Sequence, residues 1–145
     1  MIGNELAILQ RAFHRECRSL AQYLGECWPW THRGDREAQE LVRSIIADER
    51  RWAEQLAELI DQRGGVPVPG TYPAEFTNCN LHFLALDHLL GRLAEFIERG
   101  VPALERDLAA TSDDPPARKL LAQMLERKRG QVTALRKLAA TGART

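Results

Sequence analysis

Three ionisable side chains interrupt apolar stripes that have helical spacing. They are Glu16, Glu49 and Lys128, and each has apolar residues three or four positions away on both sides. Positions three and four apart share one face of an α-helix, so all three side chains should face a core. A buried charge is costly unless it is paired or bound to a metal. The spacing therefore favours one shared polar site over three separate boundary positions, from which each charged group would reach solvent.

Four helices are expected to position these side chains. Apolar residues recur at steps of three and four in four segments of the chain, which is typical of amphipathic helices. No segment shows the alternation of β-branched residues that predicts a strand. The expected helices cover about residues 4–28, 35–63, 79–110 and 115–140.

Helix-breaking and helix-capping residues predict where these helices begin and end. Pro29 should end the first helix, because a proline inside a helix removes a hydrogen bond and introduces a clash. Asp35 is a predicted N-cap for the second helix, and Asp114, followed by a proline, is one for the last. Gly64 and Gly65 predict the C-terminal end of the second helix.

Residues 65–78 are expected to form the one long link. They contain three prolines and two glycines, so no helix is expected there. Asn78 or Asn80 is a predicted cap for the next helix, which Gly100-Val101-Pro102 should kink or restart. Two helix pairs joined by one long crossover, between the second and third helices, match an up-and-down four-helix bundle. Residues 1–145 should then form a single domain.

The composition narrows the range of partners. The chain has 20 basic and 20 acidic side chains and a formal charge of +0, so it has no long-range field toward phosphate or anionic lipid. We expect no nucleic-acid partner and no membrane partner. No apolar run approaches the roughly 18 residues that cross a bilayer, and Met1–Glu5 shows no signal-peptide pattern.

The odd number of cysteines, without Cys-x-x-Cys spacing, is typical of reduced thiols in a cytoplasmic protein. They are Cys17, Cys27 and Cys79.

Two segments resemble the first two helices of the ferritin-like superfamily, of the bacterioferritin and rubrerythrin kind. Residues 46–60, Ile-Ala-Asp-Glu-Arg-Arg-Trp-Ala-Glu-Gln-Leu-Ala-Glu-Leu-Ile, are similar to its second helix, where Glu-x-x-His precedes a leucine-rich run and glycines. Residues 15–24, Arg-Glu-Cys-Arg-Ser-Leu-Ala-Gln-Tyr-Leu, are similar to its first helix, where a tyrosine follows the ligand glutamate two turns later. Glu16 and Glu49 are 33 residues apart, the gap that two antiparallel helices need to bring both carboxylates to one level. The resemblance implies a ferritin-like four-helix bundle.

The metal ligands of that family are only partly present. Its di-iron centre uses four glutamates and two histidines. Trp52 stands at one histidine position, and Lys128 with Gln131 replaces the other Glu-x-x-His pair. On the third helix Glu95 has the matching spacing to Lys128, but Glu98 suits the inner face better. The resemblance implies a vestigial metal site, with other residues that replace the metal or fill its place. The vestigial ligands are Glu16, Glu49 and Glu98, and the replacing residues are Lys128, Trp52 and Gln131.

A protonated lysine cannot bind a metal, but its charge can stabilise nearby carboxylates. We therefore expect Lys128 to replace the metal electrostatically and Trp52 to fill the vacated volume. The expected function is that of a non-enzymatic bundle without a cofactor, which acts as a structural, oligomeric or partner-binding module. By family analogy it should form a homodimer through apolar helix faces, or a higher homo-oligomer.

Two other functions stay open. Glu16, Glu49 and Glu98, with His88 recruited, could form a remodelled site for iron or another divalent metal, in a di-metal oxidase or an iron-storage protein. Alternatively, a small apolar ligand could take the place of the metal, in a core pocket beside Trp52. The remaining histidines are expected at surface or boundary positions. They are His14, His32 and His82, and without a bound metal His88 is expected at such a position too.

Overall fold

The all-α prediction is confirmed. The computed structural model describes residues 2–29, 31, 33–78 and 85–142, and these residues form helices and links without any β-strand. In chain order the elements are α1 (Ile2–Cys17), α2 (Leu20–Glu26), the 3₁₀ helix η1 (Arg33–Asp35), α3 (Arg36–Gln62), α4 (Ala74–Asn78), α5 (Leu86–Ala110) and α6 (Pro115–Gly142).

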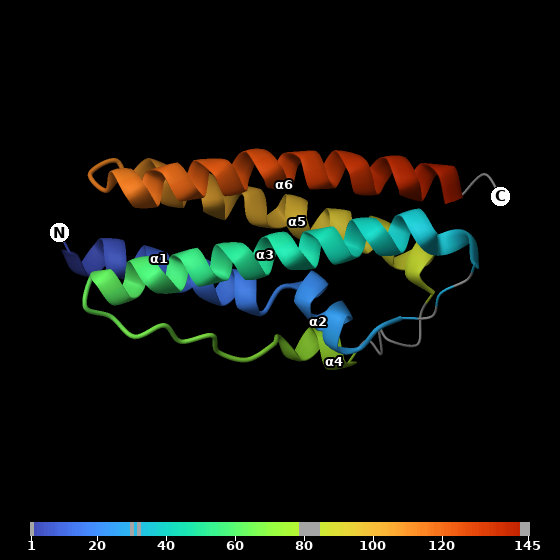
Figure 1. The fold of residues 1–145 in the computed structure, drawn as a ribbon, viewed down its shortest axis with the longest axis horizontal. Helices are drawn as coiled ribbons and strands as arrows, with labels where there is room; N and C mark the ends of the chain where they lie inside the picture. Colours follow the sequence, from blue (N-terminus) through green and yellow to red (C-terminus); the bar gives the residue numbers. More distant parts are fainter. Residues whose placement is uncertain (1, 30, 32, 79–84, 143–145) are drawn as a thin grey trace.

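Figure 1 shows α1, α3, α5 and α6 running side by side along the long axis of the molecule. The chain runs out along α1 and α2 and returns along α3. The link after α3 then crosses back past α1, so α5 starts at the same end as α3 and runs in the same direction. α6 returns beside α5, its main packing partner, while α3 packs against both α1 and α6. Side chains from α1, α3, α5 and α6 therefore meet in one interior.

The first predicted helix, 4–28, is wrong as a single element, because the chain breaks after Cys17. Ser19 is extended (φ −74°, ψ 165°), and its Oγ accepts a hydrogen bond from the backbone N–H of Gln22 at 3.1 Å. A serine that caps a new helix competes with continuation of the old one. The break directs the side chains of Ser19 and Gln22 toward the interior, where both are buried.

The second and last helices agree closely with the predicted ranges. α3 ends at Gln62, and Gly64 follows with φ +80°, a conformation that glycine adopts without strain. α6 begins at Pro115, and Asp114 Oδ1 accepts a hydrogen bond from the N–H of Ala117 at 3.3 Å, which confirms the predicted N-cap.

Three predictions for the middle of the chain are wrong. Ala74–Asn78 is helical although it belongs to the segment 65–78, because the prolines end at Pro73 and leave it free. α5 begins at Leu86, since Ala85 is extended. It continues through Pro102 without interruption, so no new helix starts there, while the kink stays a prediction. Asn78 lies inside α4 and is no cap for the third helix, and Asn80 lies outside the described residues.

Side chains on one face of α1 and at its C-terminal end hold the long link through its backbone. Gln10 Nε2 donates to the carbonyl of Val66 at 2.6 Å, and Arg18 Nε donates to the carbonyl of Gly70 at 2.8 Å. Between them, His14 Nδ1 lies 2.7 Å from the carbonyl oxygen of Pro69. Gly70 has φ +72°, and a Cβ there would collide with the imidazole of His14. The crossover is therefore fastened along α1.

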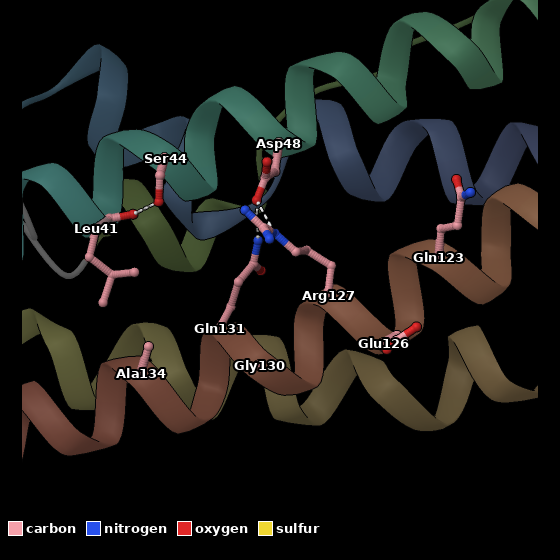
Figure 2. Close-up of a pocket in the computed structure, with 9 residues that line it drawn as sticks. All are labelled: Leu41, Ser44, Asp48, Gln123, Glu126, Arg127, Gly130, Gln131 and Ala134. Atoms are coloured by element: carbon pink, nitrogen blue, oxygen red, sulfur yellow. Dashed lines mark hydrogen bonds and ion pairs between the residues drawn. The ribbon is translucent and has the colours of Figure 1, made fainter.

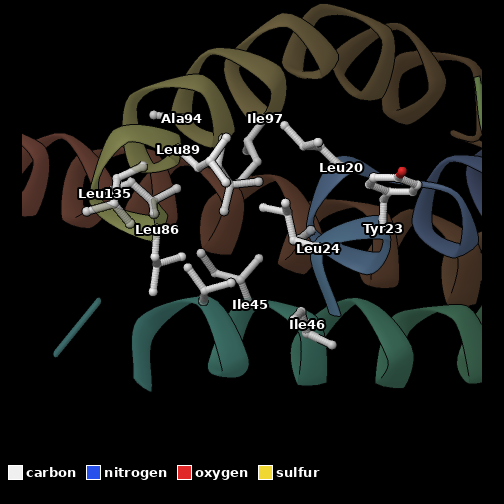
Figure 3. Close-up of a cluster of buried hydrophobic side chains, with 14 of the residues drawn as sticks. Leu20, Tyr23, Leu24, Ile45, Ile46, Leu86, Leu89, Ala94, Ile97 and Leu135 are labelled. Atoms are coloured by element: carbon white, nitrogen blue, oxygen red, sulfur yellow. The ribbon is translucent and has the colours of Figure 1, made fainter. Parts of the chain in front are cut away.

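Two clusters of buried apolar side chains fill the interior, one toward each end of the long helices. The first joins α2, the first half of α3, α4, the first half of α5 and the end of α6. Figure 3 shows its side chains from α2, α3, α5 and α6. The second joins α1, the second half of α3, the second half of α5 and the first half of α6. Between the two clusters lie buried or mostly buried polar side chains of α1, of the start of α2, of α3 and of α6. These positions are Glu16 and Ser19, Asp48 and Glu49, and Lys128 and Gln131.

Among the polar side chains outside that layer, Asp114 should contribute most to the free energy of unfolding. Besides capping α6, it pairs with Arg63 through Nε–Oδ2 and Nη2–Oδ1 contacts of 2.6 and 2.5 Å, which joins the end of α3 to the start of α6. Hydrogen bonds from Arg63 hold the pKa of Asp114 below its ordinary value. We expect Asp114→Ala to lower the free energy of unfolding by about 2 kcal/mol at pH 7 in urea denaturation.

The exposed neighbour Asp113 is the matched control, and Asp113→Ala should change stability little. Because the pKa of Asp114 is lowered in the folded protein, its contribution is present above its ordinary pKa and is lost as the pH falls through the folded value. The difference between wild type and Asp114→Ala should therefore shrink in acid. An effect that is equal at pH 7 and pH 3 would contradict the ionic part of this assignment.

Candidate functional site

The three ionisable residues of the sequence analysis meet in the polar layer between the two apolar clusters. Lys128 Nζ lies 2.7 Å from Glu16 Oε1 and 3.1 Å from Glu16 Oε2, and 3.8 Å from Glu49 Oε2. The relative exposure is 3% for Glu16 and 1% for Glu49, and it is 12% for the Lys128 side chain. The structure thus brings two carboxylates from α1 and α3 to one ammonium from α6.

Of the two carboxylates, Glu49 accepts more hydrogen bonds. Its Oε1 accepts hydrogen bonds from Ser19 Oγ at 2.7 Å and from Gln22 Nε2 at 3.1 Å. Gln22 Nε2 also donates to the carbonyl of Ile46 at 3.0 Å, which fixes the amide in place. Sequence reasoning missed both donors. The sequence signal was weak, because α1 ends between Glu16 and Ser19 and one helical register does not extend from Glu16 to Ser19 and Gln22.

Burial and neighbouring charges shift the pKa values of Glu49 and Lys128 within this cluster. Burial raises the pKa of Glu49 to about 7, helped by the nearby Glu16 and opposed by the ammonium of Lys128. For Lys128 burial acts to lower the pKa, but the carboxylates of Glu16 and Glu49 outweigh it and raise the pKa above its ordinary value. The lysine is therefore charged at neutral pH, while Glu49 exchanges a proton in that range.

Trp52 lies against this cluster from the side of α3. It is buried at 3% exposure, and Lys128 Nζ sits 5.0 Å from the centroid of its ring. At that distance the negative face of the indole attracts the ammonium, by an amount on the order of 1 to 2 kcal/mol when desolvated. The position that carries a histidine in the ferritin-like pattern thus provides an aromatic contact for the lysine.

Gln131 is buried, but it faces a different acid. Its Nε2 donates to Asp48 Oδ2 at 3.0 Å, and Arg127 Nε donates to the same oxygen at 3.0 Å (Figure 2). Arg51 reaches Asp48 Oδ1 at 3.0 Å. Asp48, Arg127 and Gln131 line a surface groove of about 550 Å³ between α3 and α6. Asp48 was not singled out from the sequence, and its carboxylate is fully occupied by these donors.

Glu98 is not part of the site, so its predicted inward position is wrong. Its side chain is 59% exposed, and it accepts a hydrogen bond from Arg136 at 2.7 Å. Glu95, the other candidate on that helix, is 63% exposed. Leu93 and Ile97 already occupy the inner face of α5, and each residue of a helix is rotated by about 100° from the next. No α5 carboxylate among the described residues therefore reaches Glu16 and Glu49.

The histidines give no further ligands within the described part of the chain. His88 is exposed at the start of α5, and His14 is engaged by the long link. His32 and His82 lie outside the described residues. A search of the described residues finds no group of three or more His, Cys, Asp or Glu side chains that could hold a metal ion. Cys17 and Cys27 are free thiols, and Cys79 is outside the described ranges.

A cavity of about 350 Å³ adjoins the cluster on the side of α1, α5 and α6. Its lining includes Glu16, Ser19, Glu49 and Lys128, together with apolar side chains from all three helices. Trp52 is not among the lining residues, so the expected core pocket exists at the cluster but not against the indole.

Within the described ranges, none of the helices combines the length and the apolar character that a membrane span requires. Comparisons with protein-family models, with curated proteins and with solved structures find no match to this chain.

Proposed function

We propose that this protein is a ferritin-like four-helix bundle in which the ammonium of Lys128 takes the place of a metal ion. The observation that carries this proposal is the contact geometry, with Nζ at 2.7 Å from Glu16 Oε1 and 3.8 Å from Glu49 Oε2. Paired carboxylates need a cation when they are buried, and here a lysine supplies it. Because the ammonium already provides a positive charge beside these carboxylates, redox chemistry at a metal is not expected here.

The course of the chain supports the ferritin-like part of the proposal. A bundle with one long crossover has its second and third helices parallel, and α3 and α5 run in the same direction (Figure 1). The link that separates them is held along α1, as described above. In this assignment α1 and α2 together correspond to the first bundle helix.

Without metal chemistry, the bundle would act through binding, as a structural or partner-binding module in the cytoplasm. Homo-oligomerisation is a further expectation from the resemblance. The exposed large apolar side chains of the described residues are Val66 at 74% and Val68 at 59%, and both lie on the link. A dimer through apolar helix faces therefore finds no support there, and self-association would have to involve the link or polar helix surfaces.

Metal content is the direct test. Purified protein should contain far less than one iron, manganese or zinc atom per chain by elemental analysis, and its melting temperature should be unchanged by a chelator. About two iron atoms per chain, the content of a di-iron centre, would favour the alternative of an iron oxidase or iron-storage protein and would overturn the proposal.

Charge reversal at the same position gives a second, sharper readout. Lys128→Glu would place a third carboxylate beside Glu16 and Glu49, so the variant should be strongly destabilised in chelator and recover stability when Mn²⁺ or Zn²⁺ is added. A ligand present at 100 times its Kd stabilises the folded state by about 2.7 kcal/mol. Lys119→Glu, on the exposed face of α6, is the control and should show no metal response. Equal responses of the two variants would contradict a cation position at Lys128.

A further inference from the structure

The cavity beside the polar cluster has a polar inner end and an apolar wall. The inner end is formed by Glu16, Ser19, Glu49 and Lys128. Exposed or half-exposed charged side chains, Arg15, Glu75 and Arg99, mark its mouth. The wall is made of apolar side chains, namely Ala12, Phe96, Ile97, Ala103, Leu104 and Met124. Buried polar groups that converge at the end of an apolar pocket are typical of a site for a small amphipathic molecule.

The inner end has hydrogen-bond donors for only part of its carboxylate oxygens. Glu16 Oε1 is buried and makes no hydrogen bond with proper geometry, although Lys128 Nζ is 2.7 Å away. Glu49 Oε2 is 3.8 Å from the same nitrogen, which is beyond hydrogen-bond range. A buried carboxylate oxygen without a donor costs free energy. A head group with several N–H donors would therefore be stabilised here.

The charges around the inner end favour a positively charged head group. Two carboxyl groups, those of Glu16 and Glu49, share the single ammonium of Lys128. Of the two cations at the mouth, Arg15 is paired with Asp107, and Arg99 lies 3.9 Å from Glu95. An anionic head would meet Glu16 and Glu49 directly, while a second ammonium would favour the ionised form of Glu49, whose pKa burial raises to about 7, and would balance its charge.

We propose that this cavity binds a small primary amine with an apolar body, its ammonium between Glu16 and Glu49 and its hydrocarbon part against Phe96, Leu104 and Met124. The volume of about 350 Å³ has room for about ten non-hydrogen atoms, at roughly 30 Å³ for each water-sized group. This inference rests on the cavity and its lining, and it does not require that the chain be related to ferritins.

Two glycines of α5 allow the cavity to be blocked with a matched control. Gly100 lines the cavity and Gly91 does not, and a Cβ at either position meets no atom within 4 Å. Both lie inside the helix, where phenylalanine is a better helix former than glycine. Gly100→Phe should therefore fold and fill the cavity, and Gly91→Phe should fold and leave it open.

Binding is measured by isothermal titration calorimetry with n-octylamine, n-octanol and octanoate as probes. The wild type and Gly91→Phe should bind octylamine at least tenfold more tightly than octanoate, and Gly100→Phe should bind octylamine at least tenfold more weakly than both. Manganese chloride, tested alone, should give no heat, since it would otherwise identify the cavity as a site for a metal ion. Octanoate or octanol binding as tightly as the amine would overturn the proposal, as would unchanged amine binding by folded Gly100→Phe or no amine binding by the wild type.

Discussion

Lys128→Ala is expected to lower the free energy of unfolding by about 3 kcal/mol at pH 7. Removing one partner of a buried ion pair leaves the other charge uncompensated, and the loss is typically 3 to 5 kcal/mol. Here the lysine is the cation 2.7 Å from Glu16, and it also neutralises part of the field at Glu49. The measurement is urea denaturation followed by circular dichroism, with the midpoint and slope fitted separately.

Lys119→Ala is the control for this prediction, because Lys119 lies on the same helix with its side chain exposed. It should change stability by no more than about 0.5 kcal/mol. The double variant Glu16→Gln/Lys128→Met removes both charges and should be more stable than Lys128→Ala, which shows that the cost comes from the unpaired acid. A change near zero for Lys128→Ala would refute the idea that the ammonium compensates these carboxylates.

Glu49→Gln is expected to stabilise the protein at alkaline pH. The pKa of Glu49 is raised from 4.5 to about 7 in the folded state, so its stabilising contribution is complete below about pH 4.5 and is lost as the pH rises through 7. At about 1.4 kcal/mol per pH unit of pKa difference, that loss is on the order of 3 kcal/mol. Glutamine stays neutral and its oxygen can accept the hydrogen bonds from Ser19 and Gln22. The variant should resemble the wild type near pH 5 and exceed it by on the order of 2 to 3 kcal/mol near pH 8.

The same substitution at Glu98 provides the comparison, because that side chain is exposed and its pair with Arg136 is accessible to solvent. Glu98→Gln should give a small difference that does not grow between pH 5 and pH 8. Unfolding free energies measured at four or five pH values would separate the two patterns. A Glu49→Gln variant less stable than the wild type at every pH would mean that the carboxylate is ionised and needed in the folded protein.

Helical periodicity alone identified the residues that meet in the polar layer. Glu16, Glu49 and Lys128 come from three helices, and steps of three and four residues were sufficient to place each on an inner face. The rule worked because each acid or base has apolar neighbours on both sides along the helix. It failed for Glu98, which has an apolar neighbour directly before it, at Ile97, but lies one residue further around the helix.

Local chemistry explains most of the other differences. The stripe of apolar residues continues from α1 into α2, so periodicity could not reveal that Ser19 caps a new helix between them. Pro102 was expected to kink α5 or restart it, but the helix is not interrupted there. The proline leaves the carbonyl of Glu98 without an N–H partner, and because Glu98 is exposed, water can donate a hydrogen bond to that carbonyl. Asp48 escaped notice because its neighbour Glu49 fitted the ferritin-like pattern. Arg51 is three residues further along the same helix, but Arg127 and Gln131 reach Asp48 only because α3 and α6 lie side by side.

Because the long link is held to α1 through its backbone, the sequence of the link can vary at positions whose side chains make no contacts. The side chains of Gln10, His14 and Arg18 contact main-chain carbonyls of the link. These contacts therefore do not depend on which side chains the link carries. Other link positions are constrained: Gly70 by its positive φ and the imidazole against it, Gly65 by Leu6 and Ile60, and Tyr72 by its hydrogen bond to Glu26. Positions such as Val66 and Val68 are thus open to sequence drift and to grafted peptides or labels, while the scaffold beneath them stays the same.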